Sequence, residues 1–365
     1  MTLHALRPEE RSEWMDVLSR MRQYDFYYLP EYHALAEARG EGRPHLFVFA
    51  EGPYLIAMPL LLRPLDTVDG LADVGDWQDA TSVYGYTGPI ASHAELPPSV
   101  LHRFRTALSV TLQDERVVAA FSRLHPLIPQ LPVLCGLGEL DTVGRTIGID
   151  LSIPPDQQFA KYRQNHRRGI NALKRRGAVC LHDRERRYLK EFIAIYHETM
   201  RRVHARPDYF FEPAYFEKLT HSLDSHMNLF VCLVDGVVAN GGLFASCHGI
   251  VQYHLGGTRD EFVTLGPTKL LFDTVRIWAN ERGAHTFHLG GGTGAADDSL
   301  LHFKEGFSDR VHHFAVWRHV LIPSVYRACC AAKTRWNERA DLRPASAAFF
   351  PAYRSPVVSS YVATT

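Results

Sequence analysis

The stretch of sequence that decides the fold is residues 287–307, FHLGGGTGAADDSLLHFKEGF. It opens with an apolar run, which is typical of a buried strand. Three glycines follow, and glycine allows positive φ and close approach of the backbone to another group. A helix then begins after Asp297 or Asp298, either of which can cap it, and carries Phe303 and Lys304. We therefore expect a strand, a loop and a short helix that hold Phe303 and Lys304 beside a site.

The composition is that of an ordinary globular protein. The chain has 365 residues, which favours two domains or one large domain. Apolar residues make up 46% and charged residues 22% of the chain. Because the formal net charge is zero, no overall field attracts the protein to DNA, to other nucleic acids or to a membrane. A site for a polyanion must therefore be a local patch of positive charge.

Cysteine, histidine and hydropathy patterns exclude several classes of protein. The six cysteines lack paired spacing and form no CxxC, which argues against a zinc ribbon or a disulfide framework and favours a reducing compartment. No HExxH or other metal spacing occurs, so we expect no metal site. The N-terminal residues do not resemble a signal peptide, and no window approaches about 18 uncharged apolar residues. We expect a cytoplasmic protein without membrane insertion.

Both halves of the sequence show the same order of expected elements: a hairpin, a strand, a helix and another strand. Helices mixed with hairpin-led sheets predict an α+β fold, with a boundary near 150–155. The expected domains are 1–152 and 153–322, followed by a C-terminal helix and tail at 323–365. The expected elements are 45–50, 54–62, a polar and aromatic loop at 75–88, 97–115 and 117–121 in the first half, and 229–234, 237–245, 250–256, 267–281 and 286–289 in the second.

This order resembles the acetyltransferase fold known as GNAT, and two such units in tandem resemble the FemABX family of aminoacyl-tRNA-dependent peptidyl transferases. Three stretches of the second half carry the resemblance. Residues 162–177, YRQNHRRGINALKRRG, are similar to the family's arginine-rich helix, and 265–271, LGPTKLL, to its proline-containing helix start. Residues 287–307 are similar to its glycine-rich loop and Phe-Lys pair. The resemblance implies two tandem GNAT-like domains, aminoacyl-tRNA as co-substrate and no resident cofactor.

Two departures from the family affect which acceptor we expect. Wall-building members carry Gln-Ser-x-x-Trp early in the first domain, where this chain has residues 28–32, YLPEY. The second half also contains no coiled-coil arm, so the chain resembles the compact members of the family. A small peptide or a peptidyl antibiotic intermediate is thus at least as good an acceptor as a peptidoglycan precursor.

A second function remains open, an acyl-CoA-dependent N-acyltransferase. Acetyl-CoA enzymes of this fold hold the pyrophosphate on backbone N–H groups at a helix start, with a Q/R-x-x-G-x-G/A pattern. The corresponding junctions here, 256–267 and 85–89, lack that spacing, and Pro267 removes a donor. This function is therefore the second choice. A ligand-binding or scaffolding protein without chemistry ranks last, because Lys304 is present.

The resemblance implies that Lys304 stabilises negative charge on the carbonyl and ribose oxygens during aminoacyl transfer, with Phe303 packed beside it. The alternative is an ordinary lysine in water and a phenylalanine in the core. No dedicated base is required, because the α-amine of an acceptor titrates near ~8. We interpret the glycines at 290–292 as structural.

Other candidate residues fall into two groups. The basic helix predicts a footprint for tRNA phosphates, although such runs are also common on solvated faces. The acceptor group combines residues placed by the resemblance with residues of the loop at 75–88. The candidate tRNA-binding residues are Arg163, Arg167, Arg168, Lys174 and Arg175, and the candidate acceptor-binding residues are Arg206, Tyr215, Tyr253, Asp79 and Tyr84.

Overall fold

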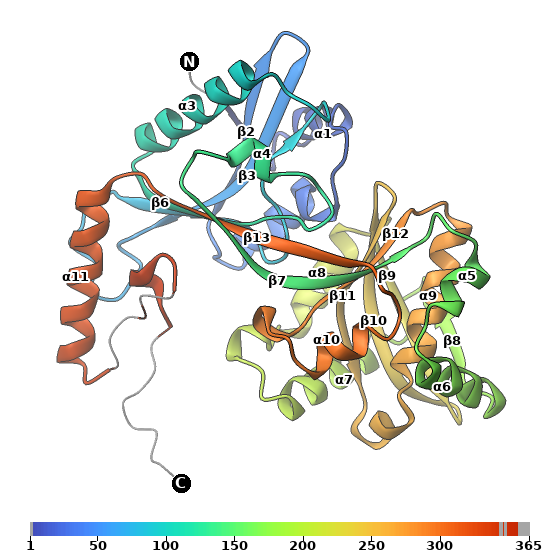
Figure 1. The fold of residues 1–365 in the computed structure, drawn as a ribbon. Helices are drawn as coiled ribbons and strands as arrows, with labels where there is room; N and C mark the ends of the chain where they lie inside the picture. Colours follow the sequence, from blue (N-terminus) through green and yellow to red (C-terminus); the bar gives the residue numbers. More distant parts are fainter. Residues whose placement is uncertain (1–2, 343–345, 347–348, 357–365) are drawn as a thin grey trace. The chain divides into compact units, whose positions relative to one another are not determined.

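The structure is a computed structural model that describes residues 3–342, 346 and 349–356 (Figure 1). Contacts divide the chain into two compact units. Unit 1 is formed by the residues up to Val143 and from Phe314 onward, and unit 2 by Gly144–His313. The domain limits expected from sequence remain a prediction, and these units differ from them in placing the chain after Phe314 with unit 1.

Unit 1 is a mixed sheet with helices against it. Its strands follow the order β1-β2-β3-β4-β6-β13, and β5 pairs with β3. Its elements are β1 (His4–Leu6), α1 (Arg11–Ser19), η1 (Phe26–Tyr28), α2 (Pro30–Ala38), β2 (Arg43–Glu51), β3 (Tyr54–Pro64), β4 (Gln78–Thr81), β5 (Ile90–Ala91), α3 (Pro98–Asp114), β6 (Val117–Arg123), α4 (Leu131–Leu134), the second part of β13 (Val311–Val320), α11 (Pro323–Arg339) and η5 (Ala352–Arg354).

Unit 2 repeats this architecture. Its strands follow the order β7-β12-β11-β10-β9-β8. Its elements are the second part of β7 (Glu139–Asp150), α5 (Pro155–Ala160), α6 (Gln164–Arg175), β8 (Val179–His182), α7 (Leu189–Arg202), η2 (Pro207–Tyr209), α8 (Pro213–Ser222), β9 (Met227–Val234), β10 (Val237–Cys247), β11 (Ile250–Thr258), η3 (Asp260–Leu265), α9 (Thr268–Glu281), β12 (Thr286–Gly291), η4 (Thr293–Ala295) and α10 (Ser299–Lys304).

Both units have the same order and pairing of strands and helices. An antiparallel hairpin, β2–β3 or β9–β10, leads to a third strand, β4 or β11. A helix, α3 or α9, then crosses over so that the next strand, β6 or β12, pairs in parallel with the third. The β9–β10 hairpin turns at Asp235-Gly236, where both residues have positive φ, 52° and 79°, as a two-residue hairpin turn requires. The result is an α+β fold built from two similar units.

The last strand of each sheet comes from a distant part of the chain. In unit 1, β13 pairs antiparallel with β6, from Val316↔Arg123 to Val320↔Ala119. In unit 2, the residues of β7 from Thr146 onward pair antiparallel with β12. The limits of the two units therefore fall inside β7 and β13.

One expected loop contains a strand. Within 75–88, residues Gln78–Thr81 form β4, which pairs in parallel with β6. The expectation of a continuous loop was wrong there because the stretch is short and polar, and its strand character depends on a distant partner. Within the expected tail, Tyr353 is fully buried. Residues 357–365 of the expected tail lie outside the described residues.

The core of unit 2 lies between its sheet and helices α6 and α9. Fully buried members come from both helices and from the facing strands, including Ile170, Val275, Phe230 and Phe287. Figure 1 shows α7 and α8 on the other side of these strands. Because Leu301 and Phe307 join the same cluster, the short helix α10 packs on the side of α6 and α9.

Candidate active site

The candidate site lies in unit 2, where two neighbouring parallel strands stop pairing. The β11–β12 ladder ends at Gln252↔His288. β11 nevertheless continues to Thr258 and β12 to Gly291. In sheets of this kind, ligands bind beyond the carboxyl ends of parallel strands, at the point where the chain connections diverge. The residues that follow the end of this ladder are therefore the first place to look for chemistry.

Lys304 is the cation at this place. It ends α10, and only 5% of the residue is exposed. Its Nζ donates a hydrogen bond of 2.6 Å to the backbone carbonyl of Gly291 and lies 5.7 Å from the ring centre of Tyr253. An ammonium group has three N–H donors, and among the described residues only the Gly291 carbonyl accepts one. Two donors thus remain for a further acceptor.

Burial sets the charge state of this amine. It lowers the pKa of Lys304 to about 8, while the carboxylate of Asp298 acts in the opposite direction. At pH 7 the amine is therefore mostly protonated. A cation held away from water interacts with a negative oxygen more strongly than a solvated lysine does. The side chain can accordingly stabilise a developing oxyanion.

Asp298 fixes the start of α10. One carboxylate oxygen accepts from the amide of Leu301 and the other from the amide of Thr293, each at 2.9 Å. Burial alone would raise the pKa of Asp298, but hydrogen bonds from the Leu301 and Thr293 amides lower it overall. Of the two predicted caps, Asp298 is the one that caps the helix. A helix of six residues needs such support, because helices this short are unstable alone.

The glycines before α10 shape the backbone. Gly290 has a φ of 77°, which disfavours other residues. A Cβ on Gly291 would lie 2.4 Å from the carbonyl oxygen of Arg145, and one on Gly292 would lie 2.1 Å from that of Ala296. These contacts support the structural interpretation of the three glycines.

The end of α10 is held by α6. The guanidinium of Arg163 donates to the carbonyl of His302 at 2.9 Å and pairs with Glu305 at 3.2 Å. Nε2 of His166 donates to the carbonyl of Phe303 at 3.0 Å. These contacts satisfy carbonyls that a helix end otherwise exposes. The helix that carries Lys304 is therefore anchored at both ends.

His166 is a neutral donor in this contact. Burial lowers its pKa to about 4, outweighing the Phe303 carbonyl, which raises it. Because the Phe303 carbonyl only accepts, we assign the proton of the neutral ring to Nε2. Nδ1 lies 3.0 Å from the side-chain amide of Asn165, which donates to it when the amide turns its NH2 group toward the ring. The ring packs edge-on to Phe307, with centroids 4.6 Å apart. A Cβ on Gly306 would lie 2.3 Å from the ring, so glycine there provides the room for His166.

Tyr253 and Phe303 form the apolar side of the site. The Tyr253 ring packs against Phe272 on α9, with centroids 4.8 Å apart, and burial raises the pKa of its hydroxyl. A Cβ on Gly256 would lie 2.1 Å from that hydroxyl. Phe303 is partly buried against the same core. The structure thus brings Tyr253, Phe303 and Lys304 together on one side of the sheet.

The basic helix α6 and its N-cap, Arg163, contain two kinds of cation. Arg163 and Lys174 are paired, with Glu305 and Asp273, each at 3.2 Å. Arg167 is half-buried, and its Nε has no partner among the described residues. Arg168 and Arg175 are exposed and lie seven positions apart, which places them on the same face of a helix. Among the described residues neither has an ion-pair partner, so these two are best placed to meet a polyanion.

Arg206 and Tyr215 belong to the segment of unit 2 that contains η2 and α8. Tyr215, on α8, is buried and stacks on Phe211, with ring centroids 4.4 Å apart. Arg206 is exposed beside η2 and pairs with Asp208 at 2.7 Å. Arg206 precedes η2 and Tyr215 lies on α8, whereas Lys304 ends α10 and contacts residues of β11 and β12.

Asp79 and Tyr84 belong to unit 1. Asp79 is fully buried, and its two carboxylate oxygens accept from Arg63 at 2.7 Å and from Arg354 at 2.5 Å. It thereby joins β3 to the C-terminal segment and is not presented to a ligand. Tyr84 is half-buried, and its carbonyl accepts from the hydroxyl of Tyr32 at 2.9 Å.

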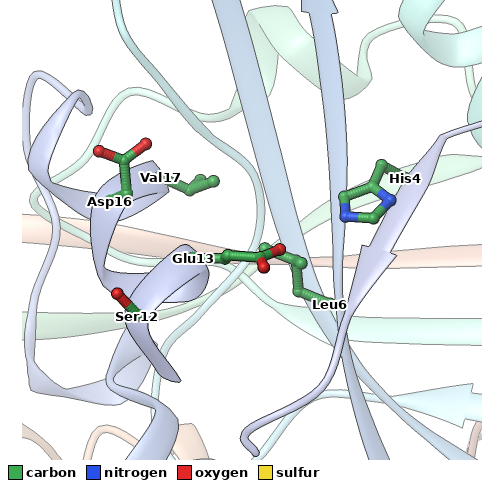
Figure 2. A pocket seen from close by; sticks show the side chains of 6 residues that line it. All are labelled: His4, Leu6, Ser12, Glu13, Asp16 and Val17. Atoms are coloured by element: carbon green, nitrogen blue, oxygen red, sulfur yellow. The ribbon is translucent and has the colours of Figure 1, made fainter. Parts of the chain in front are cut away.

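A depression in unit 1 lies between β1 and α1. Figure 2 shows Glu13 and Asp16 extending from the helix, and His4 on the strand opposite. The remaining lining residues are Leu6, Ser12 and Val17. Its acidic rim does not match the positive charge expected of a phosphate-binding surface, so we do not assign the candidate site here.

The described part of the chain shows neither a metal centre nor a membrane span. Among the described residues, no group of three or more His, Cys, Asp or Glu side chains is placed to hold a metal ion. No helix in the described part of the chain combines the length and apolar character needed to cross a membrane.

Sequence reasoning did not single out His166. The spacing of the sequence does indicate it, because His166 precedes Ile170 by four positions and Leu173 by seven and so lies on the apolar stripe of the helix. All three residues are buried in the structure. A polar residue on the apolar stripe of a helix needs an internal partner. The partner itself, the Phe303 carbonyl, lies too far along the chain to be identified from that pattern.

Comparisons with known proteins support this fold. Residues 160–305 match the family model described as an acetyltransferase (GNAT) domain. No curated protein matches the sequence. The structure of FemX is similar, with a TM-score of 0.67 and 14% identity, over 89% of this chain and 99% of FemX.

Two further structures are similar at lower scores. L-PGS from Bacillus licheniformis has a TM-score of 0.53 and 13% identity, over 88% of this chain and 96% of that one. The C-terminal domain of a candidate lysylphosphatidylglycerol synthetase from Agrobacterium fabrum has a TM-score of 0.54 and 13% identity, over 88% and 94%. Together with the repeated plan, these likenesses bear out the expected α+β fold with two tandem GNAT-like domains.

Proposed function

We propose that this protein is an acyltransferase that moves an amino acid from a charged tRNA onto the amine of a peptide or peptidyl small molecule. Lys304 carries the proposal. It is a buried ammonium that uses one of its three N–H donors among the described residues, and it lies where β11 and β12 stop pairing. The match of residues 160–305 to the acetyltransferase domain family supports acyl transfer, and the likeness to FemX supports the tandem fold in which we place it.

The reaction needs little from the protein beyond position and charge. The neutral amine of the acceptor attacks the ester carbonyl of the aminoacyl-tRNA, so that a C–N bond forms while the C–O bond to the ribose breaks. The proton lost by the amine passes to the departing ribose oxygen, directly or through water. Lys304 donates to the oxygen on which negative charge grows, and this charge is larger in the transition state than in the substrate.

The surroundings of Lys304 suit this role. The hydrogen bond to the Gly291 carbonyl fixes one N–H and so orients the other two. Tyr253 and Phe303 exclude water from one side. A preorganised donor of this kind does not have to reorganise during the reaction, which is the main source of its effect.

The donor tRNA would be held by exposed cations. Arg168 and Arg175 present charge on one face of α6, and that helix is bonded to α10 through Arg163 and His166. Phosphate contacts supply affinity without reading sequence, which suits a protein that receives the common 3′ end of a tRNA.

The acceptor is either a peptidoglycan precursor or a small peptidyl intermediate. The likeness to L-PGS and to the candidate lysylphosphatidylglycerol synthetase adds phosphatidylglycerol to the acceptors that a search should contain. An acyl-CoA donor is the alternative function. Pro267 at the cap of α9 provides no N–H for a pyrophosphate, which argues for the tRNA donor.

The experiment that tests the function uses the full-length protein, a pool of charged tRNAs and candidate acceptors, with mass spectrometry to detect the gain of one aminoacyl mass. We expect the product to disappear after RNase treatment. Activity that persists after RNase and requires only an acyl-CoA would establish the alternative instead.

A matched pair of variants connects this activity with the site. Lys304→Met removes the cation and should lower turnover by about 100-fold or more, as removal of an oxyanion donor does. Lys218→Met makes the same change at an exposed position of α8 and should leave turnover unchanged. Equal turnover in both variants would refute the role of Lys304.

A further inference from the structure

Two cysteines lie directly opposite each other on neighbouring strands of unit 2. The antiparallel ladder between β8 and β9 pairs Cys180 with Cys232. Cys232 is fully buried in the core, and Cys180 packs against the same core while remaining partly exposed. Their positions in the sequence are far apart, so the pairing depends on the folded sheet.

The geometry of this pair suits a disulfide. Opposite residues of an antiparallel ladder have Cα atoms about 4.5 or about 5.5 Å apart, depending on the type of pair. Disulfides form across Cα separations of roughly 4.4–6.8 Å, so either type is within range. Opposite side chains also project on the same face of the sheet. No movement of the backbone is therefore required to bring the two sulfur atoms together.

We propose that Cys180 and Cys232 form a reversible cross-strand disulfide, which makes this pair a site of oxidative modification. Cys180 reacts first, because it is the partly exposed member. Its thiolate attacks a disulfide oxidant such as oxidised glutathione, forming a mixed disulfide and releasing one glutathione thiol. The thiolate of Cys232 then displaces the second glutathione. The pair loses two protons and two electrons, and the oxidant is reduced to two thiols.

The environment of the pair sets the rate of this reaction. A hydrogen bond with Cys232 raises the pKa of the Cys180 thiol, and burial raises it further. Because the thiolate is the nucleophile, its scarcity at pH 7 slows the attack. We therefore expect the pair to oxidise more slowly than the exposed Cys135, and faster as the pH is raised.

The disulfide would fix one end of the basic helix. β8 is the outer strand of the unit 2 sheet, and only residues 176–178 separate it from α6. A covalent bond to β9 would anchor this edge strand to the sheet interior. The modification site stands on the strand register alone and does not depend on the proposed transferase activity.

The test uses the full-length protein carrying Cys135→Ser, which suppresses crosslinks between molecules through the exposed thiol. The protein is incubated with oxidised glutathione at pH 7 and pH 9, and its remaining thiols are blocked in denaturant. Peptide mapping by mass spectrometry then identifies any joined peptides. We expect one linked pair, Cys180–Cys232, formed faster at pH 9 and removed by dithiothreitol, together with a higher melting temperature of the oxidised protein.

Two controls make the result decisive. Cys180→Ser should abolish the linked pair, whereas Cys330→Ser, at an adjacent-cysteine sequence in α11, should leave it unchanged. Recovery of Cys180 only as a mixed disulfide with glutathione would overturn the proposal, because Cys232 would then be unable to reach it. Recovery of both cysteines as free thiols at pH 9, after an incubation many times longer than the one that oxidises Cys135 in the unaltered protein, would overturn it as well.

Discussion

Nε2 of His166 donates a hydrogen bond of 3.0 Å to the backbone carbonyl of Phe303, the residue before Lys304. This contact joins the basic helix α6 to the short helix that carries the candidate catalytic cation. The sequence pattern indicated that both helices matter, but it indicated separate tasks for them. In the structure, part of the basic helix supports the other helix from inside the protein.

The first prediction concerns this support. His166→Ala removes the donor to Phe303 and should lower turnover by about tenfold by loosening α10, while the KM for tRNA stays unchanged because no phosphate contact is lost. His166→Gln, whose side-chain amide can still donate, should recover part of the activity. Steady-state kinetics of both variants provide the measurement. A raised KM with unchanged turnover would instead place His166 in substrate binding.

The second prediction separates the exposed cations of α6 from the paired cation at its C-cap, Arg176. Arg168→Gln and Arg175→Gln should each weaken tRNA binding and reduce the slope of log K against log salt by about 0.7–0.9. Arg176→Gln is the matched control, because Arg176 is already paired with Asp235 at 2.5 Å. For this variant, the slope of log K against log salt should match that of the unaltered protein. The measurement is a titration at several salt concentrations, and equal slopes for all three variants would argue against this footprint.

The third prediction follows from the burial of Lys304. Its pKa is lowered to about 8 in the folded protein, against about 10.4 in the unfolded chain, so the unfolded state binds more protons between these values. The free energy of unfolding of the unaltered protein therefore rises, through this residue, as the pH increases from 8 to 10. Lys304→Met should increase the free energy of unfolding at pH 7 by on the order of 1–3 kcal/mol, and this gain should shrink above pH 8.

Denaturant unfolding of the two proteins at pH 7 and at pH 10 measures this difference. A Met variant that is less stable than the unaltered protein at pH 7 would mean that the Lys304 ammonium stabilises the fold. In that case the loss of activity on substitution could not be separated from a loss of structure.

The fourth prediction contrasts two glycines that both lack positive φ. Gly306→Ala would place a Cβ 2.3 Å from the buried ring of His166, and the clash should destabilise the protein by about 1–3 kcal/mol. Gly169→Ala lies inside α6, where the nearest atom is the flexible side chain of Lys269 at 3.2 Å. There the better helix propensity of alanine should stabilise the protein by up to about 1 kcal/mol. Equal stability changes in denaturant unfolding would contradict the close fit of His166.

Local patterns were sufficient to predict much of the fold. The hairpins, the crossover helix at 267–281 and the helix carrying Phe303 and Lys304 follow from apolar periodicity and turn residues, and they form as expected. Asp298 was one of two predicted caps and is the one used. Each of these features depends on residues close together in the chain.

The features that escaped prediction all depend on distant partners. β4 is a strand because β3 and β6 accept it on either side. The charge of Asp79 is satisfied by Arg354, far along the sequence. Likewise, which cations of α6 are paired depends on carboxylates of other elements. Periodicity contains no information on such contacts, because they are set by how the elements pack.

The pairing of β6 with β13, a strand from near the C-terminus, also affects how the protein folds during its synthesis at the ribosome. β6 receives its neighbour β13 only after about 200 further residues have been made, because Arg123 pairs with Val316. At typical translation rates this interval is roughly 10–40 s. During that time the edge of β6 that β13 later covers is open, and open strand edges are prone to aggregate. Unit 1 therefore cannot complete its sheet until β13 has been synthesised. We expect chaperones to bind the nascent chain during this interval.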